Sequence, residues 1–228
     1  MKKIALAFFM CVFFLPGLTI YALDLATGVG LRINPYLEQL TLTAADYEDA
    51  YVTNKWLDWG IYAFFDAKYI EFDLSYYRAL AGSYEQSKFG EPFDLKTIYK
   101  TYNISYLELA LLGKYPFTIG PAGQIYIYAG FAYKFNLTAD YGYKENNGDI
   151  PKEFRDQMKI KVGSGFDFHV YRNIFFRTDL SLGFLIITKE WKDRKILLKN
   201  IFTNLSGLKL NYGGFGAELS LAIVYKIK

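Results

Sequence analysis

The chain has 228 residues, of which 52% are hydrophobic, 19% aromatic and 21% charged. Its net charge of +3 is too small to indicate nucleic-acid binding, and its single cysteine excludes a disulfide framework. After the first 22 residues nothing approaches 18 consecutive apolar residues, so any crossing of a membrane must be made by strands.

The first expected element is a secretory signal peptide. Lys2 and Lys3 precede an apolar run over residues 4–15, and Pro16-Gly17 and Ala22 follow it. This order is typical of a cleaved signal, so we expect cleavage after Ala22. An uncleaved anchor helix is disfavoured because Pro16-Gly17 interrupts the apolar run.

The domain organisation follows from that cleavage. Residues 1–22 are the expected signal peptide, and residues 23–228 are long enough for one all-β domain. Cys11 lies inside the signal, so the mature chain has no cysteine, and a closed hydrogen-bonded barrel is one way to stabilise an exported chain without disulfides.

Eight segments of the mature chain alternate between apolar and polar residues. Residues two apart in a strand share a face, so each segment is expected to have one apolar and one polar side. In chain order the segments are residues 24–33, 57–66, 69–76, 102–111, 125–135, 159–169, 174–184 and 218–227. In the fourth segment the phase changes near Tyr106, which predicts a β-bulge there.

The joins between segments are expected to be of two kinds. Short turns are predicted at residues 66–68, 114–123 and 171–173, whereas the other four joins are long, at more than 20 residues each. All five prolines of the mature chain are expected in joins and none in a strand: Pro35, Pro92, Pro116, Pro121 and Pro151. The pattern predicts an all-β, eight-stranded antiparallel transmembrane β-barrel with short periplasmic turns and four long extracellular loops. A soluble sandwich with its apolar face inward has the same alternation and stays open as an alternative.

The polar faces are expected to line the lumen. Glycines share these faces with the charged residues, and small residues suit the crowded inner side of a narrow barrel. The predicted lumen charge network consists of Arg32, Asp58, Glu71, Asp73, Glu108, Lys134, Lys159, Lys161, Asp167, His169, Arg177, Asp179 and Glu218, with Asp24, Asp66 and Lys226 in the same phase. We expect a structural network of ion pairs there, with a selective polar or proton path as the alternative.

His169 is the only histidine, so a catalytic site would have to use it, and we predict no catalytic site. The phase places His169 in the lumen beside Asp167, and no serine lies next to it, so an ion-paired lumenal histidine is expected and an enzyme is not. No metal site is expected with one His and no mature Cys, although Asp46, Glu48 and Asp49 leave a calcium site open.

Two sets of aromatic residues suit a membrane interface. The segment TKEWKDRKILLKNIF, residues 188–202, mixes bases with aromatic and aliphatic residues, as an interface with anionic lipid does, and a strand extending past the membrane explains it equally well. Interfacial girdles are expected from Phe65, Tyr115, Phe117, Phe135, Tyr171 and Tyr225.

Residues 106–135, YLELALLGKYPFTIGPAGQIYIYAGFAYKF, resemble the middle of small bacterial outer-membrane β-barrel proteins of the OmpX, OmpW and porin-family type. There a Tyr-Leu-Glu-aliphatic strand leads to Leu-Leu-x-Lys-Tyr, and a glycine-containing strand follows the turn. The matching positions are Tyr106, Leu107, Glu108, Leu109, Leu111, Leu112, Lys114, Tyr115, Tyr128, Ala129 and Gly130.

The resemblance implies a Gram-negative-type outer membrane, no cofactor, and either solute passage or surface interaction. We expect a monomer in contact with outer-membrane lipid that is a narrow porin-like or small hydrophobic-solute conduit. The alternative is a surface adhesion, interaction or structural protein without transport, whose long loops bind a surface ligand.

Overall fold

The computed structural model describes residues 24–44, 47–86, 98–99, 103–140, 157–186 and 209–227. The strands are β1 (Leu25–Ala44), β2 (Tyr47–Ala67), β3 (Ile70–Gln86), β4 (Ile98–Tyr99), β5 (Asn103–Ile119), β6 (Gly123–Asp140), β7 (Gln157–Tyr171), β8 (Ile174–Ile186) and β9 (Lys209–Ile227), and a single 3-10 turn, η1 (Gly120–Ala122), joins β5 to β6. Within these residues, no helix has the length and apolar character needed to span a membrane.

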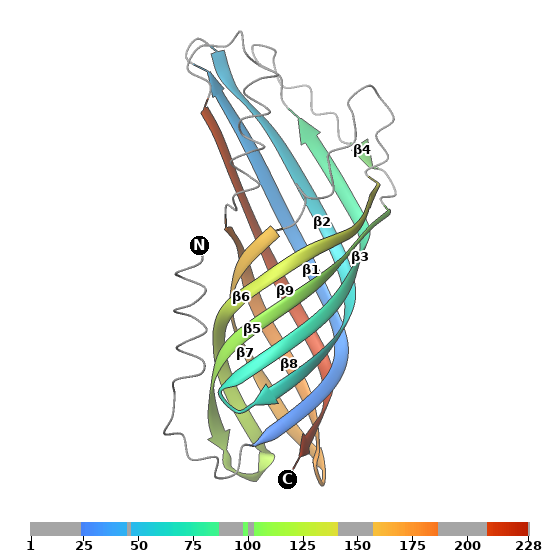
Figure 1. Ribbon diagram of the computed structural model, residues 1–228, viewed down its shortest axis with the longest axis vertical. Helices are drawn as coiled ribbons and strands as arrows, with labels where there is room; N and C mark the ends of the chain where they lie inside the picture. Colours follow the sequence, from blue (N-terminus) through green and yellow to red (C-terminus); the bar gives the residue numbers. More distant parts are fainter. Residues whose placement is uncertain are drawn as a thin grey trace, which may run out of the picture.

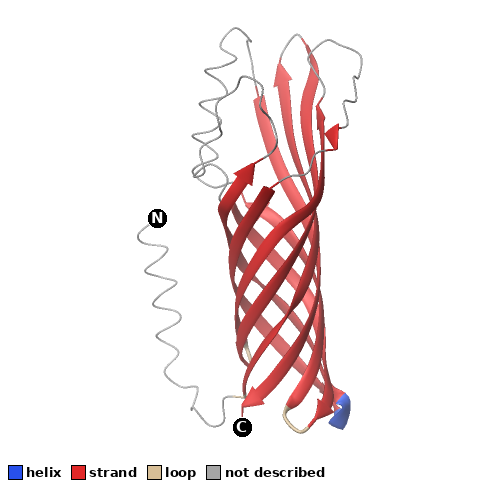
Figure 2. Ribbon diagram, turned by 90° about the vertical axis from the view of Figure 1, so that its right-hand side faces the viewer, coloured by secondary structure: helices blue, strands red, loops and turns tan. Residues whose placement is uncertain are grey.

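Eight of these strands form a closed antiparallel barrel, as the sequence predicts. The hydrogen-bonded order is β2-β1-β9-β8-β7-β6-β5-β3, and a further pairing of β2 with β3 closes the ring. The two-residue strand β4 is an addition to the barrel, pairing with β3 at Ser83 and Tyr84. Strands β1 and β9 are neighbours in the wall, and the short turns lie at the same end as the start of β1 and the end of β9 (Figures 1 and 2).

The register fixes the width of the barrel. Tyr76 on β3 pairs directly with Leu107 on the neighbouring strand β5. If the paired residues are followed from Tyr76 in the other direction, from strand to strand around the ring, the path reaches β5 at Phe117 instead. The offset between Leu107 and Phe117 is ten residues, which for eight strands gives a tilt of about 41° and a Cα radius of about 8 Å. A barrel this narrow has room for side chains and for little else.

The three short turns are confirmed, but the join at residues 114–123 is mostly strand. Strand β5 continues to Ile119, and β6 begins at Gly123, so only η1 remains as the connection. The bulge predicted near Tyr106 is confirmed, because the register of β5 with β6 shifts between Ser105 and Tyr106. The expected long join between the first two segments is wrong: β1 and β2 stay paired as far as Ala44 and Tyr47, with a register shift after Leu42, and rise as one hairpin at the extracellular end (Figure 1).

Two prolines lie inside strands, contrary to expectation, and each lies where its missing N–H is tolerated. Pro35 is in β1 opposite Leu57, and the paired residues of β1 and β9 are interrupted beside it. Pro116 is in β5 opposite Tyr126, on a stretch that runs beyond the start of β3. Pro121 lies in η1, and Pro92 and Pro151 lie outside the described residues.

The outer surface of the barrel is apolar. The outward residues of β9 include Leu219, Leu221 and Ile223, and their side chains are 46–62% exposed. The six girdle residues predicted from the sequence all point outward and are exposed: Phe65, Tyr115, Phe117, Phe135, Tyr171 and Tyr225. An apolar surface of this size is unfavourable in water. The prediction that the apolar faces of the strands point toward lipid is therefore confirmed, and the alternative of a soluble sandwich is wrong.

Candidate functional site: the charged interior of the barrel

Twelve of the thirteen residues predicted to form the lumen charge network are buried in the barrel. They are Arg32, Asp58, Glu71, Asp73, Glu108, Lys134, Lys159, Lys161, Asp167, Arg177, Asp179 and Glu218, each 8% exposed or less. The alternation of the strands puts these side chains inward because the opposite face meets lipid.

His169 is the exception, and its expected pairing with Asp167 is wrong. Its Nε2 lies 2.8 Å from the backbone carbonyl oxygen of Arg172, in an exposed contact beside the β7–β8 turn. The ring of His169 packs against Phe175, with 5.0 Å between ring centroids. The phase of His169 is inward, but the residue lies so close to the end of the strand that its side chain stays at the rim.

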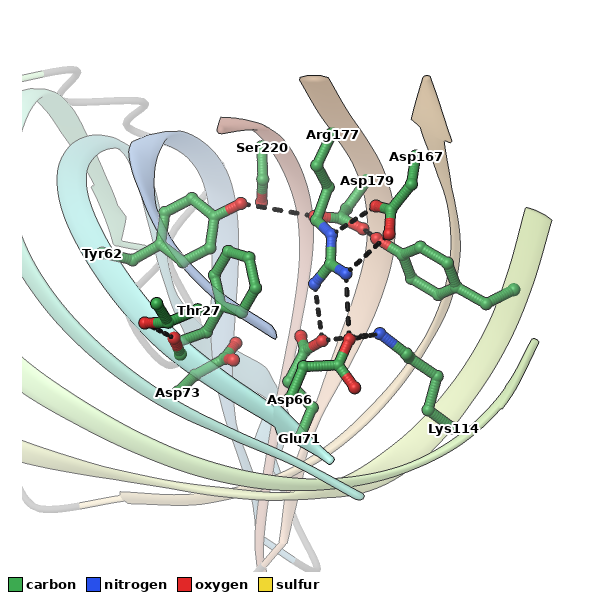
Figure 3. Close-up of polar contacts among 12 residues, drawn as sticks. Thr27, Tyr62, Asp66, Glu71, Asp73, Lys114, Asp167, Arg177, Asp179 and Ser220 are labelled. Atoms are coloured by element: carbon green, nitrogen blue, oxygen red, sulfur yellow. Dashed lines mark hydrogen bonds and ion pairs between the residues drawn. The ribbon is translucent and has the colours of Figure 1, made fainter. Parts of the chain in front are cut away.

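Near the periplasmic end, five side chains form what we call the lower cluster: Asp66, Glu71, Lys114, Asp167 and Arg177 (Figure 3). The Arg177 guanidinium is 0% exposed and donates through Nε to Asp167 Oδ1 at 2.6 Å and through Nη1 to Glu71 Oε2 at 2.6 Å. Its Nη2 donates to Asp66 Oδ2 at 3.0 Å and to Asp167 Oδ2 at 3.1 Å. Lys114 Nζ donates to Asp66 and, at 3.0 Å, to Glu71. Two cations are therefore held among three carboxylates that come from three different strands.

Higher in the barrel, six side chains form the middle cluster: Arg32, Asp73, Glu108, Lys159, Lys161 and Glu218. Arg32 Nη2 lies 2.6 Å from Asp73 Oδ2, and its other donors reach two serine hydroxyls. Lys161 Nζ bridges Glu218 at 2.7 Å and Glu108 at 3.2 Å. The middle cluster has three cations and three carboxylates, so its formal charge is balanced.

Tyrosines complete the interior as hydrogen-bond donors to carboxylates. Tyr126 donates to Asp179, with Tyr62 as a second donor at 3.4 Å, and Tyr77 donates to Glu218. Cations also stack on these rings: the guanidinium carbon of Arg32 lies 3.6 Å from the centroid of Tyr62. Such contacts attach the ionic clusters to the wall.

The lumenal glycines provide the space for these rings. Six inward aromatic residues lie directly opposite a glycine on the next strand; the pairs are Phe64–Gly28, Tyr62–Gly30, Tyr77–Gly60, Tyr128–Gly163, Tyr126–Gly165 and Tyr36–Gly216. A Cβ added at Gly28, Gly30, Gly60, Gly163, Gly165 or Gly216 would lie 2.3–2.8 Å from an atom of the facing ring. Each aromatic side chain therefore occupies the space that a Cβ would need at its glycine, which keeps the narrow lumen filled.

Lys114 is a lumenal residue that the sequence did not predict. It begins the short turn predicted at residues 114–123, but it shares the inward phase of Leu112 and is 4% exposed. Two residues placed in the lumenal phase lie instead at the rim. The Asp24 carboxylate is 72% exposed and lies 3.4 Å from Lys68, and Lys226 is 28% exposed.

The interior has an excess of acid. Among the described residues eight buried carboxylates face six buried cations, since Asp66 and Lys114 join the twelve side chains named above. Two carboxylate oxygens, Asp66 Oδ1 and Asp73 Oδ1, are buried and have no protein partner. A buried carboxylate oxygen needs a hydrogen bond, so these two positions suit internal water.

These features define a transmembrane β-barrel of the outer-membrane type: a closed ring of tilted antiparallel strands, apolar outside and ionic inside, with the short turns, the start of β1 and the end of β9 on one rim. The protein is a small eight-stranded barrel of the outer membrane of a Gram-negative-type bacterium.

No family model and no curated protein match the chain. Among solved structures it is similar to the outer membrane protein OprG from Pseudomonas aeruginosa, at 15% identity over 90% of this chain and 96% of that chain, with a TM-score of 0.45. It is similar to the outer membrane protein AlkL in lipid bilayers, at 13% identity over 90% of each chain, with a TM-score of 0.42. It is also similar to the Neisserial surface protein NspA, at 15% identity over 86% of this chain and 97% of that chain, with a TM-score of 0.38.

Proposed function

We propose that the protein is a monomeric barrel with an ionically closed interior that acts through its extracellular end, rather than by passing solutes along its axis. The observation that carries this proposal is the pair of ionic clusters that fill the lumen at two heights. Of the two functions predicted from the sequence, the geometry gives more support to surface interaction than to conduction.

The size of the barrel and the burial of the clusters argue against an open axial path. The lumen of a barrel with a Cα radius of about 8 Å is filled when side chains as long as arginine and tyrosine project into it from all eight strands. Arg177, Asp73 and Asp167 are each 0% exposed, so they have no contact with bulk solvent. Opening the lumen would separate buried ion pairs, and removing one partner of such a pair typically costs about 3 to 5 kcal/mol.

The extracellular extension of the wall offers a surface for contact. A tilted strand needs about 9 to 11 residues to cross the bilayer, whereas β1 has 20, β2 has 21 and β9 has 19. The surplus of about ten residues carries these strands about 25 Å beyond the membrane at the tilt given above. In Figure 1 the upper ends of β1, β2 and β9 rise past those of β5 to β8. This projection suits recognition of a ligand outside the cell better than the support of a pore.

Planar-bilayer recording on refolded protein tests the proposal. We expect no steady conductance from the unmodified protein. A variant with Ser at Arg177 and Asp167 in the lower cluster and at Arg32 and Asp73 in the middle cluster removes one cation and one anion from each cluster and should give measurable ion flow. A gel comparing unboiled with boiled samples shows whether each variant is folded. Steady conductance of the folded, unmodified protein would overturn the proposal.

A binding assay provides the complementary test. Vesicles carrying the protein should adsorb to extracellular-matrix or envelope preparations. A variant in which residues 41–51 are replaced by a two-residue turn removes the tip of the β1–β2 hairpin and leaves the lower pairs of the two strands in place. Equal adsorption by the two proteins would argue against a role for the extension.

A narrow conduit is the second candidate, and the partnerless oxygens of Asp66 and Asp73 favour it. They lie in the lower and middle clusters, where internal water would be the beginning of a polar path. An apolar solute would have to cross both clusters, so a hydrophobic-solute conduit needs a route that leaves the axis. The same bilayer recordings, with vesicle-swelling assays for uncharged solutes, separate this candidate from the first.

The proposal includes no enzymatic activity, no cofactor and no nucleic-acid partner. The polar contact of His169 is with the backbone carbonyl of Arg172 at the rim, away from both clusters. Both the calcium site considered at Asp46, Glu48 and Asp49 and the basic segment 188–202 fall outside the described residues or their described side chains.

A further inference from the structure

The lipid-facing wall carries a charged residue where apolar ones are expected. Arg78, on β3, points outward and is exposed, between Tyr76 and Leu80 on the same face. Directly opposite it on β2 lies Trp59, which is also outward and 38% exposed. Among the outward positions with described side chains in the eight wall strands, the other charged residue is Lys55, four residues further along β2 toward the extracellular end.

The height of Arg78 in the wall explains why a charge is tolerated there. Eight residues separate it from Ile70 at the periplasmic end of β3, which corresponds to about 20 Å along the membrane normal at a tilt of about 41°. The apolar band of such barrels is about 25 Å tall, so Arg78 lies close to its extracellular boundary. The cost of a lipid-facing cation falls steeply toward that boundary, and the long side chain can extend toward the head groups.

The neighbours of Arg78 identify its surroundings as interfacial rather than aqueous. Trp59 and Tyr76 are of the type that gathers at the level of the head groups, and Leu80, beyond Arg78, is 58% exposed on the same face. Apolar side chains flank this guanidinium on both its periplasmic and its extracellular side, so the molecules next to it are lipids. Phosphate is the anion that this level of a bilayer supplies, and the planar guanidinium binds it in a bidentate manner.

We propose that Arg78, with Trp59 and Tyr76 beside it, is a binding site for the phosphate of an anionic lipid of the outer leaflet. The guanidinium binds the phosphate, and the two rings contact the upper part of the acyl chains and the lipid backbone. Lys55 extends the positive charge toward the extracellular side on the neighbouring strand. The site gives the barrel one face, β2–β3, that selects its lipid neighbour.

Lipid selectivity in reconstituted vesicles tests the site. The probes are spin-labelled phosphatidylglycerol and spin-labelled phosphatidylcholine in phosphatidylcholine vesicles, and the measured quantity is the motionally restricted fraction of each. We expect the unmodified protein to favour phosphatidylglycerol and Arg78→Gln to lower this preference about five-fold, the factor that corresponds to about 1 kcal/mol for one cation at a membrane surface. Arg78→Lys should retain most of it.

Lys68→Gln is the matched control because Lys68 is a half-exposed cation in the turn at the periplasmic rim. It should leave the preference caused by Arg78 in place. If Arg78→Gln matches the unmodified protein, or Lys68→Gln lowers the preference as much, the proposal is overturned. Neither variant removes a buried contact described here, and the gel shift on boiling checks that both are folded.

A second measurement tests the depth on which the proposal depends. The chain has three tryptophans, and replacing Trp56 and Trp191 with Phe leaves Trp59 as the sole tryptophan, whose emission can be excited selectively at the red edge of the absorption band. Bromine labels placed near the head group should quench Trp59 more strongly than labels at the end of the acyl chain. The reverse order would put Arg78 near mid-membrane and would contradict the site.

Discussion

The substitution Arg177→Ala should destabilise the barrel more than most single changes. It removes four hydrogen bonds to three buried carboxylates and the stacking of the guanidinium on Phe64, whose ring centroid is 4.2 Å away. Asp167 would lose its close cationic partner, since Lys226 is 3.9 Å from it and partly exposed. Leaving buried charge uncompensated typically costs about 3 to 5 kcal/mol, and we expect that loss in the free energy of unfolding.

Equilibrium unfolding by urea in lipid vesicles measures this loss. The folded fraction can be followed by tryptophan fluorescence and by migration of the unboiled protein on a gel. With an m value of about 2 kcal/mol/M, a loss of about 3 to 5 kcal/mol lowers the midpoint by about 1.5 to 2.5 M. Lys68→Ala, which breaks an exposed pair with Asp24, should change the free energy of unfolding by less than about 1 kcal/mol.

A double variant separates lost attraction from uncompensated charge. Replacing both Arg177 and Asp167 with leucine removes one charge of each sign, so its cost should be smaller than that of Arg177→Ala alone. A midpoint for Arg177→Ala within experimental error of the unmodified protein would refute the view that the lower cluster supports the barrel. A double variant as unstable as the sum of its single changes would refute the pairing.

Three further predictions concern the lumen, the wall and the rim. Gly165→Ala should lower the free energy of unfolding by about 1 to 3 kcal/mol, because its Cβ would lie 2.1 Å from a buried carboxylate oxygen. Gly183→Ala should be nearly neutral, since the atom nearest to its Cβ is 3.8 Å away. Urea unfolding midpoints compare the two variants. Leu221→Arg lies at the centre of the lipid-facing run of β9 and should lower the free energy of unfolding by about 2 to 4 kcal/mol. Tyr225→Arg lies at the rim and should lower it by about 0 to 1 kcal/mol. Unfolding in vesicles measures both. His169→Ala should leave the gel shift intact and change the unfolding free energy by less than about 1 kcal/mol, because the side chain is at the rim; loss of the folded band would place this histidine among the buried contacts.

The sequence predicts the barrel well wherever a strand has lipid on one side and the lumen on the other. The alternation from Ile174 to Phe184 assigns Arg177 and Asp179 inward, and the structure places both there. That contrast weakens outside the membrane, where both faces meet water. The upper parts of β1 and β2 therefore show little alternation. For this reason the sequence predicts a loop between the first two segments, where the structure has a long hairpin.

The partners of the charged residues could not be read from the sequence. Alternation gives the face of each side chain, but the register and the ten-residue offset decide which strands bring their charges together. Arg177 meets Asp66 and Glu71, which precede it by 111 and 106 residues. Lys114 falls in the short turn predicted at residues 114–123, but β5 continues through it, and Pro116 is accommodated because β5 extends past β3 at that point.

The pairing of β1 with β9 has a consequence for biogenesis. The first and last strands of the barrel share a long hydrogen-bonded seam, with Leu25 opposite Ile227, so the ring cannot close until β9 has been synthesised and exported. Before closure, both of these strands have an unpaired edge, and such edges promote association between chains. Contacts this distant in sequence also make folding slow. Chaperoning in the periplasm therefore has to last until translocation of the final strand.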